Sequence, residues 1–448
     1  MGEGDGEGTE KGELEARSET LLRGGAVTNK GRDKKAGSSR WWPFWACVIV
    51  GTSFFIRALF TGQWVLSALP IGLFFGFFLQ KGDLCGASAF SEVLLMRDGR
   101  KVFGLWIGIV VSMAGFAAVS LLGWVSLSPK PLLWVNDIAG GLIFGVGTVL
   151  AGGCISGCLY KSAMGNINSI VALLAMPVGI AFVEHGPLTY WATKVKAIKL
   201  MASGGGPVTL SSLSGLPFWS WALIFAALTA AAALIWRRKR RETISDVGRT
   251  PSNDKPGSPL VRPWKPWQAG GAIGLLVVAS LFSSAAAGRN YPIGVTHGVL
   301  NIQELLTESN LIHIMGPTAN APQAPPATAS APSGAKKITW WLVLVVAGLF
   351  FGAFASASLS GRVKLQPKPP EQIVAALLGG FLVGTGAAIA TGCVVGNIMS
   401  GWPLMSVGMF LFGIAVILAN WMTTYIYLMG GTFASLPGTL RLMFRRGR

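Results

Sequence analysis

Two glycine-rich stretches decide the fold: IAGGLIFGVGTVLAGGCISG at residues 138–157 and ALLGGFLVGTGAAIATGCVVG at residues 376–396. Cys154 of the first stretch recurs as Cys393 of the second, an offset of 239 residues (393 − 154). Glycines follow the same offset: Gly140, Gly141, Gly145, Gly147, Gly153 and Gly157 recur as Gly379, Gly380, Gly384, Gly386, Gly392 and Gly396. Glycine is common in membrane helices, but so many matches in one register with a cysteine among them indicate an internal duplication.

A weaker second pairing extends the duplication. QKGDLCGASAF at residues 80–90 aligns with GRNYPIGVTHG at residues 288–298, which puts Gly86 over Gly294 at an offset of 208. The two offsets differ by 31 residues (239 − 208), about the length of a Pro/Ala-rich segment that lies between them in the second half. In this pairing Cys85 is matched by an isoleucine, so that thiol is not duplicated.

Composition around these stretches is that of a membrane protein. Hydrophobic residues make up 51% of the chain and charged residues 12%, and no charged residue occurs between Glu371 and Arg441. A spanning helix needs about 20 mostly apolar residues. The sequence therefore predicts an all-α polytopic membrane protein with ten spans, at 41–61, 63–80, 102–127, 132–150, 169–187, 217–236, 267–287, 338–360, 372–390 and 403–425.

Four further apolar segments are too short to span: 85–96, 155–167, 294–306 and 394–402. Irregular backbone at membrane depth is tolerated only where protein or a water-filled path covers it. We interpret these segments as half-helices or re-entrant turns inside the bundle. The alternative is that some of them lie at the membrane interface.

Charge distribution predicts the topology and the domain organisation. Basic segments flank the spans, and with ten spans both termini fall on the cytoplasmic side, although Lys194, Lys196 and Lys199 would then face outward. The first cysteine helix and its copy run in opposite directions, which makes the two repeats inverted, an architecture of transporters. The expected parts are a disordered tail (1–40), a first membrane repeat (41–236), a basic linker (237–266), a second membrane repeat (267–430) with an outer Pro/Ala-rich loop (314–337), and a basic tail (431–448).

Several function classes are disfavoured by the sequence. The net charge of +18 lies in loops and tails, without a basic stripe interleaved with aromatics, so we do not expect nucleic-acid binding. Five cysteines in or beside apolar segments do not form a disulfide framework. The three histidines are scattered, which argues against a metal site, and no Walker A or Rossmann motif is present. We therefore expect no metal, no cofactor and no catalytic residues.

The breaks after the glycine-rich helices offer chemistry for an anion. A half-helix start leaves backbone N–H groups free to attract an anion, and a thiol there is a weak, polarizable donor suited to a terminal sulfur atom. The sequence therefore predicts a path lined by thiols and by the glycines that flank them, namely Cys85, Cys154, Cys393, Gly86, Gly153, Gly157, Gly392 and Gly396. Lys161 and Arg289 are the best-placed cations, although each could instead reach a lipid headgroup. Cys158, Lys81 and Glu92 are further candidates, while Cys47 is expected to be inert.

Four segments resemble the YeeE/YedE family of sulfur-transport membrane proteins: GDLCGASAFSEVLLMRDGR (82–100), NDIAGGLIFGVGTVLAGGCISGCLYKSAMGN (136–166), RNYPIGVTHG (289–298) and LLGGFLVGTGAAIATGCVVG (377–396). This resemblance implies uptake of thiosulfate or a related sulfur or selenium species across the bacterial inner membrane, past thiols matching Cys85, Cys154 and Cys393. It also implies that a cytoplasmic TusA-like sulfurtransferase takes over the sulfur. The long N-terminal tail, the Pro/Ala-rich loop and Ile155-Ser156 depart from the family pattern, so the substrate is not decided by it.

Two other function classes stay open at this point. One is a membrane thiol oxidoreductase or sulfurtransferase that cycles disulfides or persulfides at Cys154 and Cys158, which would need a redox partner. The other is an accessory subunit, for which replacing the thiols would be harmless. Transport of a small sulfur-containing anion is the reading that the sequence favours.

Overall fold

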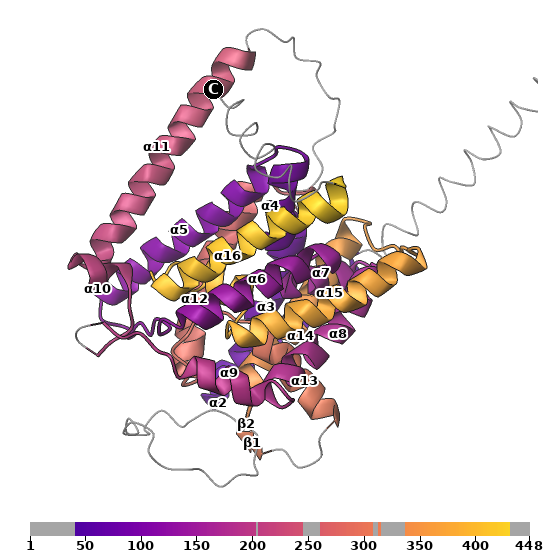
Figure 1. Cartoon of the computed structure of the whole chain (residues 1–448), viewed down its shortest axis with the longest axis horizontal. Coiled ribbons are helices and arrows are strands. Elements are labelled where there is room, and N and C mark those ends of the chain that lie inside the picture. The colour runs from indigo at the N-terminus through magenta and orange to yellow at the C-terminus, as the bar shows by residue number, and fades with distance from the viewer. Residues whose placement is uncertain (1–40, 203–204, 245–259, 308–311, 315–336, 431–448) are drawn as a thin grey trace, which may run out of the picture.

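The computed structural model describes residues 41–202, 205–244, 260–307, 312–314 and 337–430. The expected terminal tails (1–40 and 431–448) and nearly all of the expected outer loop (314–337) lie outside these residues. The described chain is a bundle of helices with one pair of three-residue strands, β1 (Ile312–Ile314) and β2 (Lys337–Thr339) (Figure 1). The all-α polytopic class is confirmed.

Nine helical segments in the described part are long and apolar enough to cross a membrane, and a shorter apolar helix, Phe218–Leu234, lies at the position of the tenth expected span, 217–236. The elements that make them up are α2 (Trp42–Thr61), η1 (Trp64–Ser67) with α3 (Ala68–Gly82), α5 (Arg100–Leu121), α6 (Trp134–Leu150), α8 (Ile167–Glu184), α11 (Phe218–Ile244), α12 (Pro266–Ala286), α14 (Trp340–Leu359), α15 (Pro370–Ile389) and α16 (Val407–Thr423) with η3 (Thr424–Leu428). Two short helices, α9 (Thr189–Lys196) and α10 (Leu210–Ser214), lie in the connection between α8 and α11.

One expected span is shorter in the structure. The segment 102–127 forms a helix only as far as Leu121, because Gly123 adopts a left-handed conformation (φ 67°) that ends it. The residues that follow, up to Leu133, form a loop that returns into the bundle. This loop carries Lys130, whose importance becomes clear at the site.

All four segments that are too short to span form half-helices. They are α4 (Gly86–Leu95), α7 (Ile155–Ala163), α13 (Thr296–Thr307) and η2 (Val394–Met399), the last a π-helical turn. A left-handed residue precedes each one: Asp83, Gly152, Asn290 and Thr391. The chain then passes through extended backbone at each cysteine before the new helix begins. The breaks are thus built locally, by a left-handed turn followed by an extended residue.

The two copies of the cysteine helix, α6 and α15, run antiparallel. A Cβ on Gly140 would meet Ala390, whereas a Cβ on Gly147 would meet Val383, so positions advance along one helix as they recede along the other. Duplicated helices that run antiparallel make the halves inverted, as predicted.

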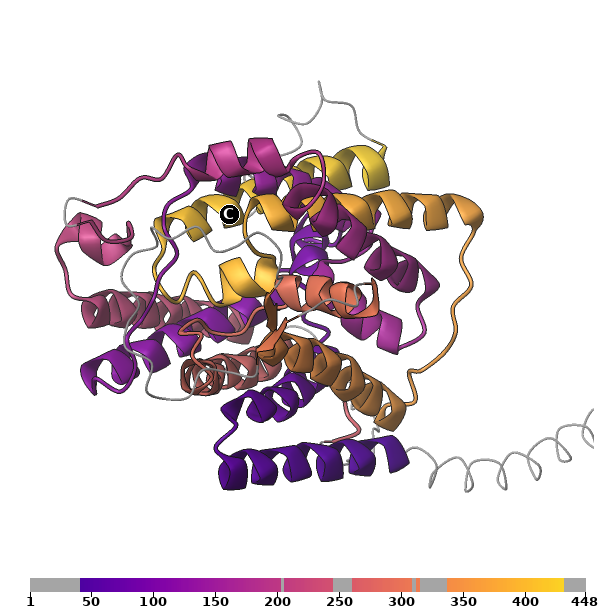
Figure 2. The same cartoon turned by 90° about the horizontal axis from the view of Figure 1, so that it is seen from below.

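Packing between the halves follows the same inversion. The repeat relates α3 to α12, α5 to α14, α6 to α15 and α8 to α16. Accordingly, α3 packs against α14 and α12 against α5, and α8 packs against α15 and α16 against α6. These interfaces depend on glycine, because a Cβ on Gly72 or Gly76 would run into the backbone of α14. Figure 2 shows α2 along one edge of the bundle, where it contacts α3 and α14, and in Figure 1 α11 lies at the periphery, outside α5.

Candidate functional site

The thiols of Cys85 and Cys154 face each other inside the bundle. Their Sγ atoms are 3.8 Å apart, both side chains are fully buried, and both cysteines are free. Each cysteine is the residue immediately before a half-helix, α4 for Cys85 and α7 for Cys154. A half-helix N-terminus with free N–H groups therefore begins at each of the two thiols.

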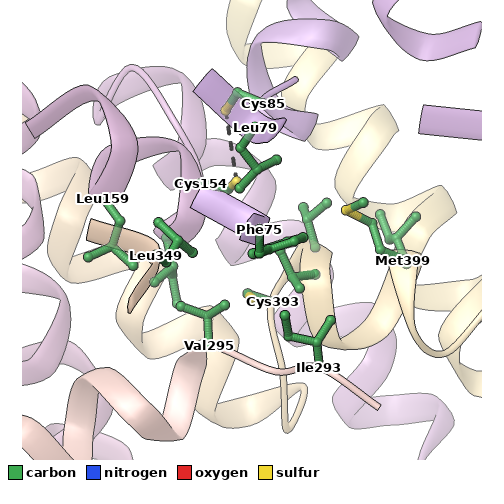
Figure 3. Packing of buried hydrophobic residues seen from close by; sticks show 14 of the residues in the cluster. Phe75, Leu79, Cys85, Cys154, Leu159, Ile293, Val295, Leu349, Cys393 and Met399 are labelled. Carbon is green, nitrogen blue, oxygen red and sulfur yellow. Dashed lines mark hydrogen bonds between the residues drawn. The ribbon is translucent and has the colours of Figure 1, made fainter. Parts of the chain in front are cut away.

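Cys393 occupies the matching position in the second half. It is fully buried, precedes η2, and lies beyond Cys154 as seen from Cys85 (Figure 3). The fourth break joins this centre through two hydrogen bonds: the Tyr291 hydroxyl donates to the carbonyl of Gly396 (2.7 Å), and the Ser400 hydroxyl donates to the carbonyl of Ile293 (2.7 Å). The structure thus brings together the three thiols that the sequence singled out and all four breaks.

Glycines at the breaks differ in what surrounds them. A Cβ on Gly157 would collide with the Sγ of Cys85, and a Cβ on Gly86 would lie 2.6 Å from a methyl carbon of Val394. Gly396, the repeat partner of Gly157, is also buried, but a Cβ there would meet nothing within 4 Å. In the second half Ile293 replaces Cys85, and the space that the Cys85 thiol fills beside Gly157 is open beside Gly396.

The other two predicted glycines pack tightly. A Cβ on Gly153 would lie 3.3 Å from the Sγ of Cys158, and a Cβ on Gly392 would press on the side-chain oxygen of Asn397. A side chain at position 392 would therefore displace Asn397, whereas one at position 153 would require the Cys158 thiol to shift slightly.

Lys161 and Lys130 bind equivalent carbonyl groups in the two halves. The Lys161 ammonium donates to the carbonyl of Gly152 (2.6 Å), and the Lys130 ammonium donates to the carbonyl of Thr391 (2.7 Å). Gly152 and Thr391 are related by the repeat offset (152 + 239 = 391), and both adopt left-handed backbone. The Cys154 break and the Cys393 break therefore each have one ammonium group beside them.

Lys130 was missed by the sequence analysis. It lies in the loop between α5 and α6. The repeat offset does not lead to it, since the position 239 residues after Lys161 is Ser400 and not a lysine. Its ammonium also donates to the side-chain oxygen of Asn397 (2.9 Å) and lies 5.2 Å from the centre of the Tyr291 ring. Burial of this ammonium, and then the charge of Arg289, lowers the pKa of Lys130 to about 8.

Arg289 lies beside the same centre but faces a cavity. Its guanidinium donates to the carbonyl of Pro292 (3.1 Å) and lies over the rings of Tyr291 (5.7 Å) and Trp341 (5.3 Å). The cavity, about 370 Å³, is lined by Glu184, His185, Arg289, His297, Leu300, Asn301, Glu304, Thr339 and Leu342. Burial lowers the pKa of Arg289 to about 10, which leaves it charged at neutral pH.

The remaining candidates have partners away from the thiols. Lys81 donates to the hydroxyl of Ser360 (2.8 Å), and Glu92 pairs with Lys101 (2.6 Å). Cys158 points at the backbone of the break, with its Sγ 3.6 Å from the carbonyl of Gly153. Cys47, in the peripheral α2, contacts the carbonyl of Phe351 at 3.6 Å.

Across the described residues, no group of three or more His, Cys, Asp and Glu side chains is placed to hold a metal ion. The groups that the structure places at the centre are thiols, half-helix N-termini and ammonium groups. Inverted halves, broken helices that meet inside the bundle, and a buried polar centre define the class: a membrane transporter built on inverted repeats.

Comparison with known proteins gives the family. A family model described as sulphur transport matches residues 81–422, so the chain belongs to the sulphur transport family. The chain is 31% identical over 373 residues to the thiosulfate transporter TsuA of Spirochaeta thermophila, covering 81% of this chain and 98% of that protein. It is 25% identical over 370 residues to the thiosulfate transporter TsuA of Escherichia coli, covering 80% of this chain and 94% of that protein. The probable transporter YedE of Escherichia coli is 29% identical over 171 residues, 36% of this chain and 39% of its own length.

Proposed function

We propose that this protein takes up thiosulfate, and that the anion passes Cys393, Cys154 and Cys85 in turn. The observation that carries this proposal is the 3.8 Å contact between the Cys85 and Cys154 thiols at the starts of two half-helices. The two TsuA relatives, similar over nearly their whole lengths, are named for thiosulfate. Their names also favour a transporter over an enzyme.

A thiosulfate ion has two unlike ends, and the centre offers a partner for each. Neutral thiols are weak donors, matched to the polarizable terminal sulfur, while ammonium groups and free backbone N–H groups suit the sulfonate oxygens. Lys130 beside Cys393 and Lys161 beside Cys154 each supply a positive charge along the thiol row. An all-oxygen anion such as sulfate would lack the sulfur contact.

Gly396, where an added Cβ would meet nothing within 4 Å, is the position at which we propose that the anion enters, near Cys393. This buried position is bordered by the Cys393 half-helix and by Tyr291, which binds the Gly396 carbonyl. In the first half the corresponding space holds the Cys85 thiol. Thiosulfate would first place its terminal sulfur beside Gly396, in contact with the Cys393 thiol. The terminal sulfur would then leave Cys393 and contact the Cys154 and Cys85 thiols.

The orientation that we propose puts the Lys130 loop outside and the C-terminal end of α7 inside. Both termini are then cytoplasmic, in the inner membrane of a bacterium, and the path leads past Lys161 into the cell. The membrane potential opposes anion entry by about 2.3 kcal/mol per charge per 100 mV, so uptake requires coupling or consumption of the anion inside. A TusA-like sulfurtransferase on the cytoplasmic side would supply that consumption.

The redox-enzyme alternative has a weaker basis. It would pair Cys154 with Cys158, but the contact of Cys154 is with Cys85, whereas Cys158 faces the backbone of its own break. A selenium species with a polarizable terminal atom would suit the same thiols and stays an alternative substrate.

Uptake of radiolabelled thiosulfate tests this proposal in bacteria that lack their own importers. We expect Cys154→Ala and Cys393→Ala to lose uptake at equal membrane abundance, while Cys47→Ala, a thiol in the peripheral α2, keeps it. Unchanged uptake in both site variants would refute the thiol path. No uptake by the parent protein would refute thiosulfate as the substrate.

A further inference from the structure

Asp137 is a buried carboxylate that the thiol path does not use. It lies in the first turn of α6, has 0% of its surface exposed, and neither of its carboxylate oxygens has a hydrogen-bond partner. The neighbouring Asn136 donates to the carbonyl of Ile389 (3.2 Å) but leaves its own side-chain oxygen without a partner. Unpartnered buried polar atoms are rare because they are costly, and within a membrane span they mark functional groups.

The helices around Asp137 hold it away from water. A Cβ on Gly408 of α16 would collide with its carboxylate, so the backbone of α16 packs directly on the acid group. The backbone of Leu133 and the ammonium of Lys130 act on the carboxylate electrostatically. Lys130 in turn binds Thr391 and Asn397 at the entrance to Cys393.

Other helices that pack against α6 also carry charged groups. The helix α4 carries Glu92, which pairs with Lys101, and α9 carries Lys194, which lies 4.4 Å from the centre of the Tyr190 ring. The segments of α15 and α16 that face Asp137 contribute the apolar and small residues Ile389 and Gly408. Beyond Lys130 lie Arg289 and Cys393, which act on Lys130.

Desolvation disfavours a charged carboxylate that has no hydrogen-bond donors in this position. A proton removes that cost. It also changes what Lys130 offers to an anion: beside a charged Asp137 the ammonium is partly neutralised, whereas beside a neutral Asp137 its full charge is available. Proton binding at Asp137 and anion binding at Lys130 therefore favour each other.

We propose that Asp137 is the proton-binding site that couples anion uptake to proton entry. The proposal rests on the proposed function and supplies the coupling that uptake against the membrane potential requires. A proton taken from the Lys130 side raises the affinity for the anion, and by reciprocity the bound anion holds the proton. Both ions are then released on the other side, so that the protein is a proton–anion symporter.

Purified protein in proteoliposomes tests this, with a pH-sensitive dye inside and the membrane potential clamped by potassium and an ionophore. For the parent protein we expect added thiosulfate to acidify the interior. Asp137→Asn, which mimics the neutral acid, should lose this acidification but keep thiosulfate counterflow at equal pH within about twofold, because exchange requires no net proton movement. Asp137→Glu, which keeps a carboxyl group, should retain acidification.

The outcomes separate the coupling from the transport function. Thiosulfate uptake by the parent without acidification would overturn the coupling and leave the transporter intact. Parent-like acidification by Asp137→Asn would assign the proton to another group. Loss of both acidification and counterflow in Asp137→Asn would give Asp137 a role in folding or anion binding, and would also overturn the proposal. Absence of thiosulfate uptake by the parent would instead refute the proposed function.

Discussion

Lys130 is the residue whose position changes the interpretation of the site most. Sequence patterns pointed to Lys161, which lies in the last turn of the half-helix after Cys154, whereas Lys130 lies in a loop between two spans. In the structure both ammonium groups bind a left-handed residue two positions before a cysteine, at Gly152 and at Thr391. The duplicated feature is therefore the carbonyl and not the lysine, so no repeat register could have identified Lys130.

Uptake should decline as the external pH rises through about 8, because burial lowers the pKa of Lys130 to about 8. A lysine is charged below its pKa, so the ammonium that would attract the anion is present at lower pH and is lost above that value. Initial rates of thiosulfate uptake between about pH 6.5 and pH 9 measure this. Lys130→Arg should lose less uptake than the parent at the alkaline end, because arginine stays charged while the proton requirement at Asp137 remains, and Lys130→Met should be slow at every pH. The same alkaline decline in Lys130→Arg would show that another group titrates.

At the scale of elements, the half-helices could be predicted because their signal is physical and local. A segment such as 155–167 is apolar but too short to span, so it must end inside the protein, and α7 (Ile155–Ala163) does. The end of α5 could not be placed within several residues, since Val125 and Leu127 continue the apolar pattern after the turn at Gly123. The contact between Cys85 and Cys154 could not be predicted from the sequence, because Cys85 has no repeat partner and its distance from Cys154 depends on how the two breaks meet in the bundle.

Glycine packing between helices gives a matched pair of variants in one helix, α12. A Cβ on Gly270 would collide with the backbone carbonyl of Gly104 in α5, whereas a Cβ on the adjacent Gly271 would meet nothing within 4 Å. We expect Gly270→Ala to destabilise the protein by about 1–3 kcal/mol through overpacking, and Gly271→Ala to be neutral or stabilising by up to about 1 kcal/mol. Thermal unfolding of the two purified variants in the same detergent compares them directly. Equal midpoints would show that α5 and α12 are less closely packed than described.

At the scale of the whole molecule, inversion of the halves explains how one path can serve both membrane faces. The antiparallel α6 and α15 bring Cys154 and Cys393 into one centre from opposite sides, and each half adds one ammonium-bound break. Exchange of the two halves' roles, with one break opening as the other closes, is the usual way in which such repeats alternate access. The direction of uptake then depends on which face carries the Lys130 loop.

Labelling of introduced cysteines decides that orientation. Gly99, between α4 and α5, and Ser126, between α5 and α6, are exposed and lie at opposite ends of α5. The native thiols Cys85, Cys154, Cys158 and Cys393 are buried, so a membrane-impermeant maleimide should react poorly with them, and Cys47→Ala removes the remaining one. In intact spheroplasts we expect Ser126→Cys to be labelled and Gly99→Cys to be labelled only after permeabilisation. The reverse pattern would place the Lys130 loop in the cytoplasm, and the ordered path from Cys393 to Cys85 would then run outward, which contradicts uptake in the proposed direction.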